Sequence, residues 1–132
     1  MNAFLQSIAS VLEVDTLDLD TPFRTLDDWC SLKAFGLLVT LENDWATPLT
    51  IDQFRTLMTC RDLYREAFIS FAANLFKVPR ETLSGTTAYE SIPQWDSVNH
   101  LRLVMEAEKR FGTHYALEQI PSLKTLNDFL IP

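Results

Sequence analysis

The sequence predicts an all-α protein built from two tandem copies of a four-helix unit. Apolar residues recur at the spacing of amphipathic helices, and no segment alternates apolar and polar residues as a strand does. The second half of the chain also repeats the first, and self-similarity at a fixed period indicates a duplicated structural unit. The length of 132 residues allows one ordinary domain or two very small ones. We therefore expect two copies, residues 1–64 and 65–132.

The clearest internal match aligns residues 29–64 with residues 95–130, an offset of 66. WCSLKAFGLLVTLENDW lies over WDSVNHLRLVMEAEKRF, and apolar residues fall at the same steps after Ser31 and Ser97. The matched apolar pairs are Leu32 with Val98, Phe35 with Leu101, Leu38 with Val104, Val39 with Met105, Leu41 with Ala107, and Trp45 with Phe111. Upstream, residues 5–12 match residues 69–76 at an offset of 64, so the second copy has a loop two residues longer.

Each copy shows the same order of elements. A first amphipathic helix covers about residues 3–13 or 65–77, and a long polar loop with turn residues follows. A second helix begins near the serine, and a short helical turn and a final helix close the copy. The junction TCRDLYREAFISFAANLFKV contains no Gly or Pro. The last helix of the first copy can therefore run directly into the first helix of the second, with no flexible linker.

The composition excludes several classes of function. The net charge of −7 gives no basic surface for nucleic acid or for an anionic membrane. No apolar run approaches the ~18 residues of a membrane span, and the N-terminus MNAFLQSIAS lacks the features of a signal peptide. Cys30 and Cys60 match no metal or disulfide spacing, so no metal site is expected and cytoplasmic residence is the default.

The residues around Ser97 carry a family resemblance. Asp96, Ser97 and Val98 open the second helix of the second copy, and the helix ends at Phe111 and Gly112. An Asp-Ser-Leu-like triplet in this helical spacing resembles acyl carrier and peptidyl carrier proteins, and the likeness extends through Ile120-Pro121 and LKTLNDFL. The resemblance implies two tandem acyl carrier-like bundles, of which the first is divergent.

The resemblance also implies the chemistry. A separate phosphopantetheinyl transferase would attach 4′-phosphopantetheine from coenzyme A to Ser97, and the thiol of the arm would carry acyl or aminoacyl thioesters. The partners would be the loading and processing enzymes of fatty acid, polyketide or nonribosomal peptide biosynthesis, and the chain itself would not be an enzyme. The phosphodiester would lie at a helix N-terminus, which favours an anion, and Asp96 is a good N-cap residue. Asp96 and Val98 would support the site.

The first copy departs from the family pattern, because Cys30 precedes Ser31 where the family has Asp. Cysteine is a poor N-cap, so we expect Asp28 to cap the helix instead and to place Ser31 about two positions deeper in it. Ser31 is then a second candidate attachment site. The first copy is either a second working carrier or a degenerate copy that stabilises the second copy or docks partner enzymes.

Other polar residues permit two alternative functions. The chain could be a helical interaction module that kept the carrier fold and lost the arm, or a small enzyme with Cys30 or Ser97 as nucleophile. No base and orienting group accompany either nucleophile, which disfavours the enzyme. We expect His100 to be a surface residue, His114 a loop residue and Cys30 a half-buried thiol. Glu42 and Glu108 are expected on the helix surface or as loop anchors.

Overall fold

The computed structural model describes all residues, 1–132, and contains helices and no strand. The α-helices are α1 (Ala3–Leu12), α2 (Ser31–Trp45), α3 (Ile51–Arg55), α4 (Cys60–Phe76) and α5 (Ser97–Phe111). The 3-10 helices are η1 (Phe23–Thr25), η2 (Arg80–Thr82), η3 (Leu117–Ser122) and η4 (Leu126–Phe129). The predicted all-α class is confirmed. None of these helices is long and apolar enough to traverse a lipid bilayer.

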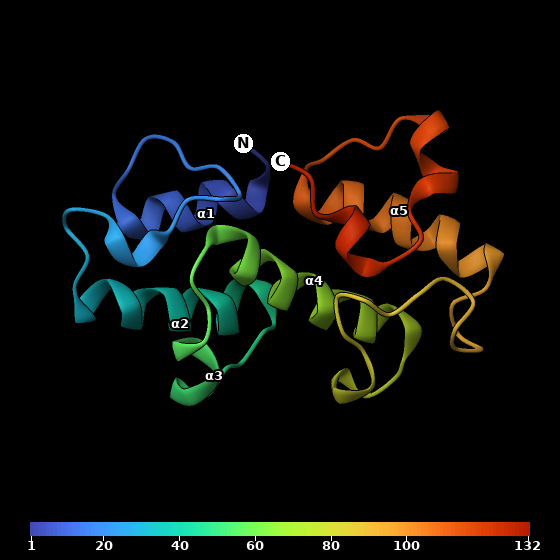
Figure 1. The fold of residues 1–132 in the computed structure, drawn as a ribbon, viewed down its shortest axis with the longest axis horizontal. Helices are drawn as coiled ribbons and strands as arrows, with labels where there is room; N and C mark the ends of the chain where they lie inside the picture. The colour runs from blue at the N-terminus through green and yellow to red at the C-terminus, as the bar shows by residue number, and fades with distance from the viewer.

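The helices are arranged around α4, which crosses the middle of the molecule (Figure 1). Helices α1, α2 and α3 lie toward one end, and α5, η3 and η4 lie toward the other. The two chain termini meet above α4, where the side-chain amide of Asn2 donates to the carbonyl of Ile131 at 3.1 Å. Helix α1 contacts α2, α4 and α5, so the N-terminal helix touches elements from both halves of the sequence.

The two halves of the chain repeat the same local hydrogen bonds. Helices α2 and α5 each have 15 residues and begin 66 residues apart, and each ends at a residue with left-handed backbone. Three backbone hydrogen bonds of the first half have an equivalent 66 residues later. Cys60 N donates to Thr21 O, as Leu126 N does to Thr87 O; Arg61 N donates to Leu19 O, as Asn127 N does to Gly85 O; and Trp29 N donates to Leu26 O, as Trp95 N does to Ile92 O. The internal similarity seen in the sequence is thus also a similarity of backbone structure.

The hydrogen bonds also locate the extra residues of the second half. At the end of α1 and of α4, Val14 N donates to Ala9 O and Val78 N donates to Ala73 O, an offset of 64. At Gly85 the offset is already 66, because the carbonyl of Gly85 accepts the hydrogen bond that is equivalent to the one accepted by Leu19. The two additional residues therefore lie between Val78 and Gly85, where the chain forms η2.

The helix expected across the junction is present as α4. Its N-cap is Thr59, whose hydroxyl accepts from Asp62 N, and the Asp62 carboxylate accepts in turn from the backbone N–H groups of Met58 and Thr59 at 2.9 and 3.1 Å. Arg65 pairs with the same carboxylate at 3.0 Å. Although burial opposes ionisation, these hydrogen bonds and the ion pair hold the pKa of Asp62 below its usual range. This capping box fixes where the helix begins.

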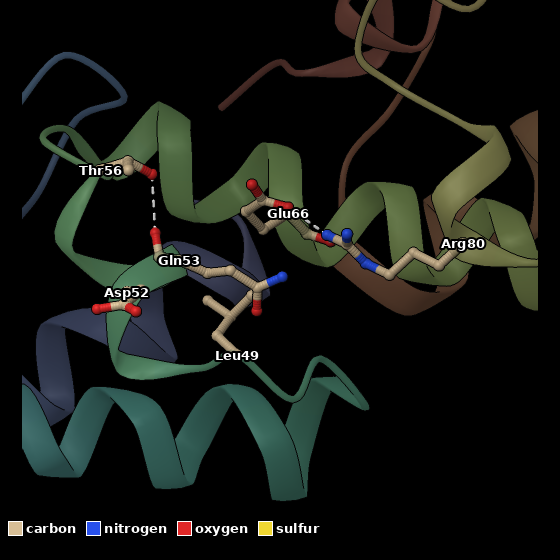
Figure 2. Close-up of a pocket in the computed structure, with 6 residues that line it drawn as sticks. All are labelled: Leu49, Asp52, Gln53, Thr56, Glu66 and Arg80. Carbon is tan, nitrogen blue, oxygen red and sulfur yellow. Dashed lines mark hydrogen bonds and ion pairs between the residues drawn. The ribbon is translucent and has the colours of Figure 1, made fainter.

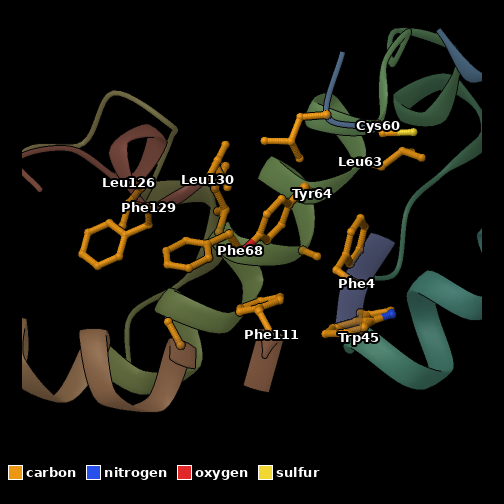
Figure 3. Packing of buried hydrophobic residues seen from close by; sticks show 14 of the residues in the cluster. Phe4, Trp45, Cys60, Leu63, Tyr64, Phe68, Phe111, Leu126, Phe129 and Leu130 are labelled. Atoms are coloured by element: carbon orange, nitrogen blue, oxygen red, sulfur yellow. The ribbon is translucent and has the colours of Figure 1, made fainter. Parts of the chain in front are cut away.

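The buried hydrophobic side chains form one cluster that includes residues from both halves. Its centre is a group of aromatic rings on α1, α2, α4 and α5 (Figure 3). Trp45 at the end of α2 stacks on Phe111 at the end of α5, with ring centroids 5.3 Å apart and planes 4° apart. Phe111 also contacts Tyr64 and Phe68 of α4, at 5.3 and 5.4 Å. The C-terminal ends of α2 and α5 therefore meet over α4.

Candidate functional site

Ser97 is the first residue of α5, and its side chain is exposed. The preceding residue, Asp96, has extended backbone and is the N-cap: its carboxylate accepts from the backbone N–H of Asn99 at 2.8 Å. The first N–H groups of a helix have no intrahelical acceptor and carry the positive end of the helix dipole. The hydroxyl of Ser97 is thus held at the tip of a 15-residue helix, open to solvent and beside unpaired donors.

The side chains behind Ser97 form a buried aromatic group. Trp95 is completely buried, and its indole N–H donates to Nδ1 of His100 at 3.0 Å. Because an indole nitrogen can only donate, Nδ1 is the acceptor and the imidazole proton lies on Nε2, which is 3.3 Å from the carbonyl of Ile120. The rings of Tyr89 and His100 have centroids 4.7 Å apart. Both nitrogens of His100 therefore serve to join the start of α5 to η3.

The prediction that His100 is a surface residue is wrong, since its exposed fraction is 8 %. The physical reason is that the indole N–H of Trp95 donates to Nδ1 and the carbonyl of Ile120 accepts from Nε2, so the ring is buried with its polar atoms satisfied. His114 lies in a loop as expected, and its Nδ1 is 3.1 Å from the carboxylate of Glu108. Glu108 also accepts from the backbone N–H of Tyr115 and is therefore a loop anchor.

Val98 is exposed and belongs to a group of exposed apolar residues that recurs at equivalent positions in the other half. On α5 and η3 the exposed apolar residues are Val98, Leu101, Met105 and Leu117. On α2 and α3 they are Leu32, Phe35, Val39 and Ile51, which are the matching positions at the offset of 66. Scattered apolar residues are normal on a protein surface, but here two groups of four recur at equivalent positions beside equivalent serines.

Ser31 occupies the same place on α2 that Ser97 occupies on α5. The helix begins at Ser31, so the expectation that Asp28 caps it and that Ser31 lies deeper is wrong. The turn in which Trp29 N donates to Leu26 O leaves Cys30 in extended backbone at the N-cap position. Cys30 makes no capping hydrogen bond. Its thiol is exposed rather than half-buried, because this position faces solvent in both halves.

The difference between the two N-caps leads to a stability prediction. Cys30→Asp supplies the missing acceptor for the first turn of α2 and is expected to raise the free energy of unfolding by about 1 kcal/mol. Asp96→Ala removes the acceptor at α5 and is expected to lower it by a similar amount. Urea denaturation followed by circular dichroism measures both changes. Cys30→Ala is the matched control and should change little; an equal gain with alanine would contradict the capping argument.

The remaining candidate residues lie apart from one another. No group of three or more His, Cys, Asp or Glu side chains lies close enough together to hold a metal ion. Burial, and to a lesser extent the charge of Asp18, raises the pKa of the Cys60 thiol to about 12, so this cysteine is not a thiolate at neutral pH. Glu42 is exposed on α2.

A polar cavity of about 330 Å³ lies between α3, α4 and η2, as Figure 2 shows. Its charged residues include Arg80 and Glu66, which form an ion pair with each other. Arg80 also donates to the hydroxyl of Ser70 at 2.8 Å. These charges are already compensated within the chain, so the cavity is a structural junction between η2 and α4.

The fold and the site together define an all-helical chain with an exposed serine at the capped N-terminus of a long helix, and a second, uncapped serine at the equivalent position. Comparison with protein families, with characterised proteins and with solved structures found no match to this chain.

Proposed function

We propose that this protein is a non-catalytic carrier of acyl or aminoacyl thioesters, bound to a 4′-phosphopantetheine arm on Ser97. The observation that carries the proposal is the placement of Ser97: an exposed hydroxyl on the first residue of α5, with Asp96 fixing the helix start. The residues present suit the group. No side chain covers the hydroxyl, and the helix N-terminus favours the negative charge of a phosphodiester.

The chain's own residues would hold the attachment point still. The Trp95–His100 hydrogen bond and the contact of His100 with Ile120 fix the first turn of α5 against η3. With both its nitrogens engaged, His100 is not placed to remove a proton from Ser97. This supports a chain that relies on a separate phosphopantetheinyl transferase and disfavours an enzyme with Ser97 as nucleophile. The thiol of the arm would supply the thioester chemistry.

The repeated backbone structure supports two fused carrier-like bundles, residues 1–64 and 65–132, with α4 belonging to both. In this proposal the second unit bears the arm. The first unit is the degenerate copy. Cys30 gives α2 no side-chain cap, whereas Asp96 caps the turn that bears Ser97 on α5. The exposed apolar residues on α2 and α5 would contact the transferase and the loading and processing enzymes.

The modification is tested by intact mass after incubation with coenzyme A and a broad-specificity phosphopantetheinyl transferase. We expect the protein to gain one phosphopantetheine group, Ser31→Ala to gain one, and Ser97→Ala to gain none. Both serines are exposed, so both variants should keep the native circular dichroism spectrum. An adduct that survives in Ser97→Ala, or no adduct on the unaltered chain, contradicts the proposal.

A second candidate is an interaction module that kept this fold without the arm. The matching apolar groups on both halves favour it, since docking alone would account for them. It requires that no adduct form and that the protein capture a partner from lysate. Replacing Phe35 and Leu101 by glutamate should abolish that capture while leaving the fold intact, because both side chains are mostly exposed.

A further inference from the structure

An apolar groove of about 310 Å³ lies beside Ser31, between α2, α3 and η1. Five of its eight lining residues are hydrophobic, and they include Phe35 and Leu38 of α2 and Ile51 and Phe54 of α3. The polar lining residues are Ser31, Arg24 and Arg55. The charged members of this lining are thus both positive. A water-sized group takes about 30 Å³ of liquid volume, so the space corresponds to roughly ten such groups.

Arg24 is a partly buried cation with no anionic partner in the chain. Its guanidinium donates to the carbonyls of Phe54 and Leu57 and lies over the ring of Phe54, 4.6 Å from its centroid. No Asp or Glu lies within ion-pair distance of it. Burial holds the pKa of Arg24 below its usual value, which reflects the cost of leaving a charge uncompensated in an apolar setting. Arg55, at the mouth, is exposed and pairs with Asp52 at 3.6 Å.

The second half of the chain has no such groove, and the sequence difference explains why. At the offset of 66, Ala34 of the groove corresponds to His100. The imidazole of His100 reaches the carbonyl of Ile120, which is the equivalent of the Phe54 carbonyl bound by Arg24. On α5 the imidazole of His100 thus reaches the carbonyl that the Arg24 guanidinium binds in the first half, whereas on α2 the small side chain of Ala34 is one wall of the groove.

The cations of the groove are also specific to the first half. The residues that correspond to Arg24 and Arg55 are Glu90 and Pro121. An open apolar space and two positive side chains thus occur together in one half and are both missing from the other. The first half lacks a side-chain helix cap but has a groove that suits a ligand with an apolar body and a negative end.

We propose that the groove of Ala34 and Arg24 is a non-covalent binding site for a free aliphatic carboxylate of about eight carbons. The hydrocarbon would lie between α2 and α3 against Phe35 and Ile51, and the carboxylate would pair with Arg24 and Arg55. The site does not require a phosphopantetheine arm on either serine. It extends the proposed function by giving the first half a ligand of its own.

The test titrates the unmodified full-length protein with octanoate, followed by calorimetry and by backbone amide NMR. We expect saturable binding with a Kd at or below about 1 mM and shifts confined to α2, α3 and η1. Acetate lacks the apolar body and octan-1-amine inverts the charge, so neither should bind. Ala34→His should weaken octanoate binding by about tenfold or more, because an imidazole on this wall of the groove takes up part of its volume and competes with Arg24 for the Phe54 carbonyl.

Matched variants separate loss of the site from loss of the fold. Val39→His places the same residue on the same helix outside the groove, where the side chain is partly exposed, and should leave binding unchanged. Arg55→Gln removes an exposed charge and should weaken octanoate binding severalfold without unfolding the chain. Absence of saturable binding, equal binding of octan-1-amine, or unchanged affinity in a folded Ala34→His variant would each overturn the proposal.

Discussion

Phe111→Ala is expected to lower the free energy of unfolding by about 3–5 kcal/mol and to destabilise both halves of the chain together. Phe111 is fully buried. It stacks on Trp45 of the first half, and it contacts Phe68 and Phe71 of α4 at 5.4 and 5.3 Å. Removing this ring leaves a cavity at the point where α2, α4 and α5 meet. The loss is a large part of the 5–15 kcal/mol that is typical of a native protein.

Two measurements check this expectation. Urea denaturation followed by circular dichroism gives the change in free energy, and hydrogen exchange with mass spectrometry gives the protection of each half separately. Phe35→Ala is the matched control, since Phe35 is 64 % exposed on α2, and it should change stability by no more than about 0.5 kcal/mol. Loss of protection in the second half alone would show that the two halves unfold independently.

Separated halves, residues 1–64 and 65–132, are not expected to fold on their own. The cut falls inside α4, between Tyr64 and Arg65. The first half would lose Phe111, on which Trp45 stacks, and the second would lose the first turn of α4 with its Thr59 cap. Chains of this size bury a small share of their surface and are marginal even when intact.

The expected result is a largely unfolded circular dichroism spectrum for each half and recovery of helix when the two are mixed. A circular permutant provides the control. In this permutant the two termini are joined, since Asn2 and Ile131 are already hydrogen-bonded to each other. The chain is opened instead in the exposed turn at Asp27–Asp28, which leaves α4 intact. The permutant should fold. A cooperative thermal transition in either isolated half would contradict the view that the halves depend on a shared core.

The helical elements were predictable because their signals are local. The helix that begins at Ser97 was indicated by Asp96 and the apolar steps after the serine. At Ser31 the same apolar steps indicated the helix, but its start was expected earlier than the structure places it. The junction without Gly or Pro is helical, and Asp96 caps α5. These features depend on side-chain spacing, caps and breakers within a few residues, which a sequence displays directly.

The environment of individual side chains was less accessible, because it depends on elements distant in the sequence. Nothing near His100 indicates that Trp95 and the carbonyl of Ile120 will receive its two nitrogens. One signal was present: the alignment pairs His100 with Ala34, a small apolar residue. The role of Gly36 likewise depends on a distant element: a Cβ there would lie 3.0 Å from Val11, so the glycine permits close packing of α1 on α2.

Apolar periodicity also did not separate core from surface. Leu32, Phe35 and Leu41 follow the same helical spacing, yet Leu41 is buried and the other two are exposed. The groove beside Ser31 could not be predicted for the same reason: it depends on how α2, α3 and η1 come together in three dimensions.

The tail-to-tail arrangement of α2 and α5 has a geometric consequence. Each helix is about 22 Å long, and the stacked rings of Trp45 and Phe111 join their C-terminal ends. Their serine-bearing tips consequently point to opposite poles of the molecule (Figure 1). Two large bodies could occupy these poles at once without collision. The distance between these two bodies would be set by rigid helices. In modules joined by flexible linkers, by contrast, that distance changes with the length of the linker.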